Sequence, residues 1–139
     1  MNRYRYLLPL ALCSALAMTA CSSAKKDWAS ASAENTVAAY ISFLEKHDND
    51  QHAQEARTRI GALQDDAAWA TAQNGNSLDN YQAYLQAEPN GTHARAARDQ
   101  IAEIDRANAW NTAQSDGSAT ALQAFLQQYP QGLEAEQAQ

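Results

Sequence analysis

Proline, glycine and basic residues are scarce in this chain, and strand-like patterns are missing from it. The 139 residues include 3 Pro and 5 Gly, the two residue types that most often interrupt helices. Much of the 45% hydrophobic content is alanine, which has the highest helix propensity, and the mean hydropathy is −0.58. Few large apolar residues therefore remain for a core. The composition predicts an all-α chain with a thin, close-packed interior.

The shortage of bases leaves the chain acidic. Lys and Arg total 10 against 16 Asp and Glu, a formal net charge of −6. Removal of residues 1–20 would take away Arg3 and Arg5 but no acid, which leaves 16 acids against 8 bases, or −8. A chain of this charge binds nucleic acid poorly, and anionic lipid headgroups repel it. We therefore expect no nucleic-acid partner, and attachment to a membrane would need a covalent lipid.

Long apolar runs are also absent. The longest apolar stretch, Leu7 to Met18, has about a dozen residues, whereas a transmembrane helix needs roughly 20. It follows two arginines and precedes small residues, which is the layout of a signal peptide. We predict a removable signal peptide over residues 1–20. Cys13 would be lost with it, so only one of the two cysteines would remain and no disulfide could form within the chain.

The segment Met18-Thr19-Ala20-Cys21 closes the predicted signal peptide. It resembles the bacterial lipobox, in which small residues precede a cysteine that is acylated on its sulfur and, after cleavage, on its amine. The resemblance implies that Cys21 carries fatty acids such as palmitate and anchors the protein to a membrane. Residues 21–27 would hold the lipidated cysteine and a short linker. By the same resemblance, Ser22 implies sorting to the outer membrane, where the protein would face the periplasm. The alternative is cleavage after Ala24, which would release a soluble periplasmic protein.

Three tryptophans mark an internal repeat. Trp28, Trp69 and Trp110 are evenly spaced by an offset of 41 in residue number, and the same offset superposes other large residues without a gap. Internal periods of this length are typical of helical arrays. The repeats are residues 28–68, 69–109 and a truncated 110–139. The superposed residues include Tyr40, Tyr81 and Leu122; Phe43, Tyr84 and Phe125; and Leu44, Leu85 and Leu126.

Each repeat is expected to hold a short helix, a tight turn and a long helix. Hydroxyl residues that can cap the short helices precede them at equivalent positions, namely Thr36, Ser77 and Ser118. These helices end near Lys46 and Ala87, and Pro89 and Gly91 then form a turn. The long helix of the second repeat runs from about Thr92 to Gln114. Its apolar stripe has spacings of 3, 4 and 3 residues and comprises Ala94, Ala97, Ile101 and Ile104.

The tryptophans lie off this apolar stripe. Trp110 is six residues after Ile104 and therefore about 120° around the helix from it. The long helix either kinks near Asp105 or, in the interpretation we prefer, presents Trp69 and Trp110 to the short helix that follows. The three tryptophans are then packing anchors of tandem α-hairpins stacked as a short solenoid. The truncated third repeat would either cap this array or leave Phe125 available to a partner or to a second copy of the chain.

The second repeat carries a recognisable motif. From Tyr81 to Ile101 it reads aromatic-x-x-aromatic-Leu, then Pro-x-Gly, then His-Ala-x-x-Ala-x-x-x-Ile. This pattern resembles the tetratricopeptide-type hairpins of bacterial envelope proteins, although its period is longer than theirs. The resemblance covers residues 28–139. It implies a tetratricopeptide-like architecture whose partners are other envelope proteins.

No combination of residues predicts catalysis or a bound cofactor. The sequence has no phosphate-binding glycine loop and no nucleophile elbow, so we expect no enzyme. The cluster from His47 to His52 could suggest a metal site, but it aligns with the turn of the next repeat and we interpret it as a turn. His52 and His93 are expected in the first turn of a helix. Asp65 and Asp66 are interpreted as a solvated helix face.

Glutamines on the short helices provide a candidate binding face. If the repeats stack in register, one surface would be lined by Gln82, Gln86, Gln123 and Gln127. We therefore expect a lipid-anchored envelope protein that acts as an adaptor or scaffold for other proteins. The alternative is a structural envelope or cell-wall-associated protein that caps a larger assembly.

Overall fold

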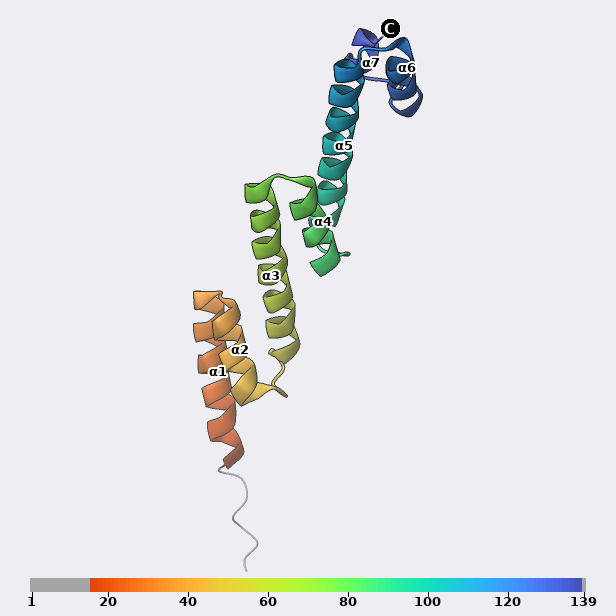
Figure 1. The fold of residues 1–139 in the computed structure, drawn as a ribbon. Helices are drawn as coiled ribbons and strands as arrows, with labels where there is room; N and C mark the ends of the chain where they lie inside the picture. Colours follow the sequence, from red (N-terminus) through yellow and green to blue (C-terminus); the bar gives the residue numbers. More distant parts are fainter. Residues whose placement is uncertain (1–15, 139) are drawn as a thin grey trace, which may run out of the picture. The chain divides into compact units, whose positions relative to one another are not determined.

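Seven helices make up the part of the chain that the structure describes. The structure, a computed structural model, describes residues 16–138, with side chains from residue 23 onward. These residues contain no strand, which confirms the predicted all-α class, and neighbouring helices pack in pairs (Figure 1). The helices are α1 (Leu16–Glu34), α2 (Val37–His47), α3 (Ala53–Gly75), α4 (Leu78–Ala87), α5 (Ala94–Asp116), α6 (Ala119–Gln128) and α7 (Leu133–Gln137).

The predicted signal peptide lies mostly outside this description. Residues 1–15 and the side chain of Cys21 are not part of it, so cleavage and lipidation stay predictions. The backbone of residues 21–27, which we expected to form a short linker, lies within α1. None of the helices among the described residues is both long enough and apolar enough to cross a membrane.

The chain divides into two compact units, Met1–Leu63 and Gln64–Gln139, and the boundary falls inside α3. In the first unit, α1 and α2 lie side by side (Figure 1) and pack with the first half of α3. The two largest fully buried side chains of the described residues are here, Tyr40 and Phe43, each 2% exposed. The rest of this cluster comprises Ala31 and Ala56, with Trp28, Ala39, Leu44, Ile60 and Leu63 against them.

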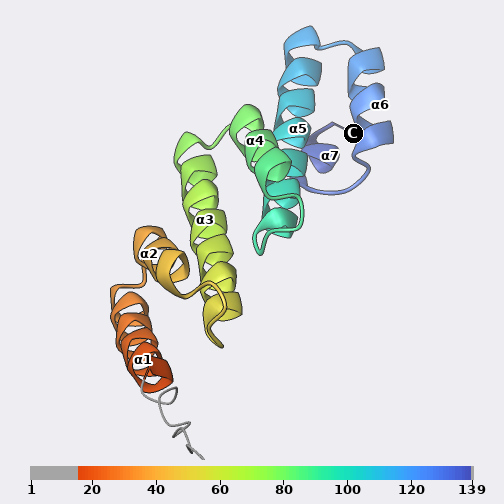
Figure 2. The same ribbon diagram turned by 90° about the horizontal axis from the view of Figure 1, so that it is seen from below.

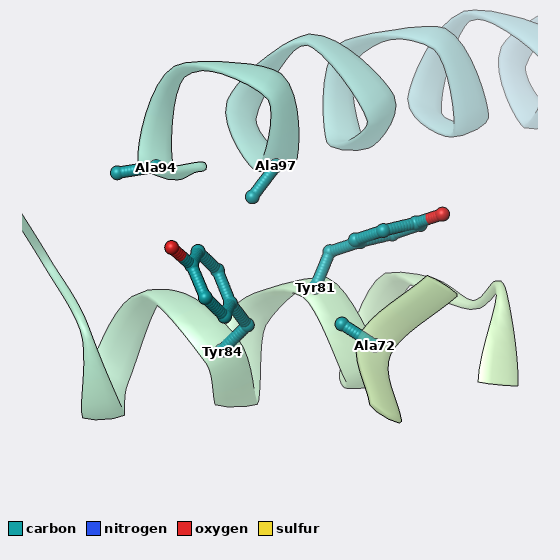
Figure 3. Close-up of a cluster of buried hydrophobic side chains, with 5 residues drawn as sticks. All are labelled: Ala72, Tyr81, Tyr84, Ala94 and Ala97. Carbon is teal, nitrogen blue, oxygen red and sulfur yellow. The ribbon is translucent and has the colours of Figure 1, made fainter. Parts of the chain in front are cut away.

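The second unit holds two further clusters that share one helix. In Figure 2, α4 lies along the first half of α5 and α6 along its second half. Figure 3 shows the first of these clusters, with the rings of Tyr81 and Tyr84 between α4 and α5. Its other buried members are Ala72, Ala94 and Ala97. The second cluster has Ala113, Phe125 and Ala138 buried, with Ala109, Trp110, Ala121, Leu122, Leu126 and Tyr129 packed against them.

The junction before each short helix has one recurring geometry. The predicted N-caps are confirmed, because backbone amides three residues on donate at 3.1, 3.3 and 3.1 Å to the hydroxyls of Thr36, Ser77 and Ser118. The residue before each cap adopts a left-handed conformation, with φ of 48° at Asn35, 42° at Asn76 and 68° at Gly117. Asn and Gly tolerate this region best. The chain thus passes from a long helix into a short helix through two residues.

The turns that lead into the long helices also match each other. Residues 48–52 form turns, as the comparison of the repeats predicted. In the first unit, Arg57 donates to the carbonyl oxygen of Asp48 at 3.3 Å. In the second, Arg98 donates to the carbonyl oxygen of Pro89 at 2.9 Å. Both arginines therefore hold the start of the turn against the helix that follows it.

Candidate functional site

Each tryptophan packs on the short helix that follows it. The ring centroid of Trp69 lies 5.8 Å from that of Tyr81 and 5.5 Å from that of Tyr84. Trp28 makes the same pair of contacts with α2 at 5.8 and 5.3 Å, and Trp110 lies 5.1 Å from an aromatic ring of α6. The α5 helix is continuous from Ala94 to Asp116. Trp69 and Trp110 thus contact the short helix that follows, as in the interpretation we preferred, and the role of the tryptophans as anchors of a stacked array stays a prediction.

Two of the tryptophans also stack on a histidine. Trp28 and His52 have ring centroids 4.6 Å apart with 6° between the planes, and Trp69 and His93 lie 5.2 Å apart with the same 6°. His93 is the N-cap residue of α5, and His52 directly precedes α3, close to the expected positions. The stacking itself was missed. The sequence signal for this stacking was that Trp28 and His52 recur together as Trp69 and His93.

Two long helices contact the residue near the start of the helix after the next. His93 Nε2 lies 2.9 Å from Asp66 Oδ1 of α3. Glu134 takes the position of His93, and its carboxylate lies 3.9 Å from the guanidinium of Arg106 of α5, which aligns with Asp65 and not with Asp66. A polar contact between the long helix and the turn that follows the short helix therefore recurs, but from a different position of the long helix.

Asp65 is buried, and this corrects the interpretation of Asp65 and Asp66 as a solvated pair. Asp65 is 5% exposed, whereas Asp66 faces solvent. The Tyr84 hydroxyl donates to Asp65 Oδ1 at 2.5 Å, and the Thr92 amide donates to Oδ2 at 2.7 Å. The bond from Tyr84 lowers the pKa of Asp65. Burial, with the bond to Asp65, raises the pKa of Tyr84 to about 12. The carboxylate thus joins the short helix to the turn.

The hairpin formed by α1 and α2 lacks both members of this polar pair. There, Phe43 takes the place of Tyr84, and Ala24, 5% exposed, takes the place of Asp65. Because both partners are absent together, neither is left buried without the other. A buried polar group without its partner would be the costly outcome. A third position changes with them. A side chain at Gly91 would collide with Asp65 and Tyr84, whereas the first repeat has Asp50 there.

Two grooves run between a long helix and the short helix that follows. One lies between α1 and α2 and has a volume of about 230 Å³, and the other lies between α5 and α6 with about 340 Å³. Every residue that lines the second groove occupies the position, two repeats later, of a residue that lines the first. They are therefore the same groove in two repeats. Their common lining comes from Ala31, Ala39 and Phe43, and from Ala113, Ala121 and Phe125.

The two grooves differ in charge. Asp27, Glu34 and Lys46 line the α1–α2 groove, whereas no charged residue lines the α5–α6 groove. The carboxylate of Asp27 lies 2.9 Å from His47 Nε2, and this hydrogen bond lowers the pKa of Asp27. Equivalent positions of the chain thus form one charged groove and one uncharged groove. Sequence reasoning missed both grooves, because small residues on paired helices also signal close packing.

Two residues of the predicted glutamine face, Gln123 and Gln127, lie on α6 next to residues that line the second groove. Gln82, Gln86, Gln123 and Gln127 are all exposed. The residues of α6 that line the groove include Ala124 and Gln128, each one position after a glutamine of the predicted face. The glutamine face therefore stays a prediction, and the groove offers a second candidate surface next to it.

No group of three or more metal-binding side chains occurs among residues 23–138. The cluster from His47 to His52 is dispersed, since His47 pairs with Asp27 of α1 and His52 stacks on Trp28. The chemistry that these residues offer is that of a contact surface, with grooves between paired helices, exposed amides and a few charges. No protein-family model, curated protein or solved structure matches this chain.

Proposed function

We propose that this chain is a lipid-anchored bacterial envelope protein that binds other envelope proteins through tandem tetratricopeptide-like hairpins. The observation that carries the proposal is the groove that recurs two repeats apart with the same apolar lining. Recurring grooves between helices suit the binding of a peptide segment or helix, because a partner can place apolar side chains between two helices. The difference in charge would let each groove select its own segment.

The size and lining of the grooves support protein segments as ligands. Volumes of about 230 and 340 Å³ accommodate a few side chains. The groove walls include Ala, Ser and Thr, which allow a partner's backbone to approach closely. The proposed site of action is the periplasmic face of the outer membrane, on the strength of the lipobox-like Met18 to Cys21 and of Ser22.

Site-specific cross-linking in living cells tests the adaptor role. A photoreactive amino acid placed at Ala124 or Ser42 lies in a groove, whereas one at Gln123 lies on the glutamine face. The control position is Arg95, whose side chain is 94% exposed. We expect a discrete cross-linked protein at one or both groove positions and none at Arg95. A partner captured only at Gln123 would favour the glutamine face, and a dimer of the chain would show self-association.

The lipid anchor has a separate test. Metabolic labelling with palmitate should mark the wild-type protein, and Cys21→Ser should abolish the label because it removes the acylated sulfur. Unchanged labelling of the variant would refute the anchor. Sedimentation with purified peptidoglycan separates the adaptor from the structural alternative. Binding to peptidoglycan without any cross-linked protein would favour a wall-associated structural role.

A further inference from the structure

We propose that Lys25 and Lys26 bind an anionic lipid surface and hold the start of α1 against it. The proposal rests on the proposed function for the position of this segment beside a membrane. The partner surface is a bilayer with anionic headgroups such as phosphatidylglycerol. The lysines would thereby fix which end of the protein faces the bilayer.

The distribution of charge along the chain supports this surface. Residues 21–26 contain two lysines and no acid, whereas residues 27–139 contain all 16 acids and only six bases, a net charge of −10. A bilayer with anionic headgroups attracts the first group and repels the second. The protein is thus electrically polarised, with its positive end at the predicted anchor.

A bilayer can reach both lysines in the structure. Both side chains are exposed on α1. Ala24 beside them is buried, and the carboxylate of Asp27 lies 2.9 Å from His47 Nε2. The hairpin therefore occupies one side of α1 and engages the nearest acid, while the lysines face away from the core.

The helix also keeps the lysines near the bilayer. Residues 21–27 lie within α1, and Lys25 is one helical turn after Cys21, a rise of about 6 Å. At physiological salt the surface potential decays over about 8 Å. Each lysine this close to an anionic surface should favour contact about fivefold. A flexible linker would spread the same charges over a larger range of distances.

Lysine acylation provides a test with an internal reference. The full chain has three lysines, Lys25, Lys26 and Lys46. The membrane-attached protein is reconstituted into vesicles of phosphatidylcholine alone or with about one third phosphatidylglycerol, and treated with an amine-reactive reagent. Mass spectrometry then gives the rate at each lysine. We expect Lys25 and Lys26 to react about fivefold more slowly on the anionic vesicles relative to Lys46, and roughly 0.5 M salt to remove the difference.

Hydrogen exchange of α1 amides gives a second measurement. Exchange over residues 22–34 should be slower on anionic vesicles for the wild type and for Lys46→Gln, and this protection should be lost in the Lys25→Gln/Lys26→Gln variant. Equal acylation rates on both kinds of vesicle, or protection that survives the double substitution, would overturn the proposal. Neither readout depends on which group attaches the chain, because an uncleaved leader also places these lysines at the bilayer. A failed palmitate test counts against the acyl anchor, whereas equal acylation rates on the membrane-attached protein count against the lysine contact.

Discussion

Tyr84→Phe should destabilise the protein substantially, and adding Asp65→Ala to it should cost little more. Removing the hydroxyl leaves Asp65, 5% exposed, with its bonds from Thr92 but without the bond from Tyr84, and an under-satisfied buried carboxylate costs about 1–3 kcal/mol. Asp65→Ala alone removes the acceptor of the Tyr84 hydroxyl, at a similar cost of about 1–2 kcal/mol. The double variant recreates the Ala24 and Phe43 combination of the α1–α2 hairpin. Its cost should fall short of the sum by about 1–2 kcal/mol.

Urea unfolding followed by circular dichroism measures these free energies. The control is Tyr129→Phe, because that hydroxyl only accepts an exposed bond from Gln128, and its cost should stay within about 0.5 kcal/mol. If the two single costs add to the double cost within about 0.5 kcal/mol, the pair is not coupled and the explanation of the paired change between repeats is refuted.

The pH dependence of the same pair gives a further check. The folded pKa of Asp65 is lowered from 3.8, so its contribution is complete above that value and is lost as the pH falls through the folded pKa. The pKa of Tyr84 is raised from 10.0 to about 12, so stability from the neutral hydroxyl is complete below 10.0 and lost as the pH rises through about 12. The cost of Tyr84→Phe should therefore be constant near neutrality and shrink at both extremes.

Three smaller substitutions test the recurring junctions and stacks. Gly117→Ala places a side chain at a residue with φ 68° and should lower the stability measured by thermal unfolding by about 1 kcal/mol. Gly117→Asn, which reproduces Asn35 and Asn76, should cost less. Equal costs would contradict the left-handed assignment. Ser77→Ala removes the cap of α4 and should cost about 1 kcal/mol, and Ser77→Thr should restore most of it; a loss shared by both variants would argue against the cap. His93→Gln removes the ring stacked on Trp69, so tryptophan emission should shift to the red and become more accessible to acrylamide. His47→Gln, which removes a ring stacked on no tryptophan, should leave emission unchanged, and identical spectra for both variants would contradict the stack.

The helix boundaries were predictable because their causes are local. Thr36, Ser77 and Ser118 cap the short helices where the hydroxyl pattern placed them, and Pro89 marks the end of α4. The long helix expected from Thr92 to Gln114 is found as α5, Ala94–Asp116. Apolar spacing and turn-forming residues act over a few positions, so one repeat is enough to reveal them. The constant offset between the tryptophans then indicated which contacts should recur.

The missed features depend on residues far apart in the chain. Asp65 looked like a surface carboxylate because its partner, Tyr84, is 19 residues away and reads as an ordinary core aromatic. His52 and Trp28 are separated by the whole of α2, and no local rule pairs them. The Asp65–Tyr84 pair could have been found from positions that change together at the 41-residue offset, and the Trp28–His52 pair from positions that recur together. The glutamine face was chosen by polarity alone, which cannot locate the grooves formed by two helices.

Because α5 contributes to two hydrophobic clusters, its length fixes how those two clusters are oriented relative to each other. Its first half carries Ala97 and Ile101 into one core, and its second half carries Ala113 into the next, with no loop between them. Inserting a single residue between Ile104 and Ala109 would therefore turn the second core by about 100° relative to the first and move it by about 1.5 Å. Arrays joined by loops absorb such insertions. The α5 helix therefore couples the two clusters rigidly. The unbroken spacing from Trp69 to Trp110 keeps both clusters in the orientation that their packing needs.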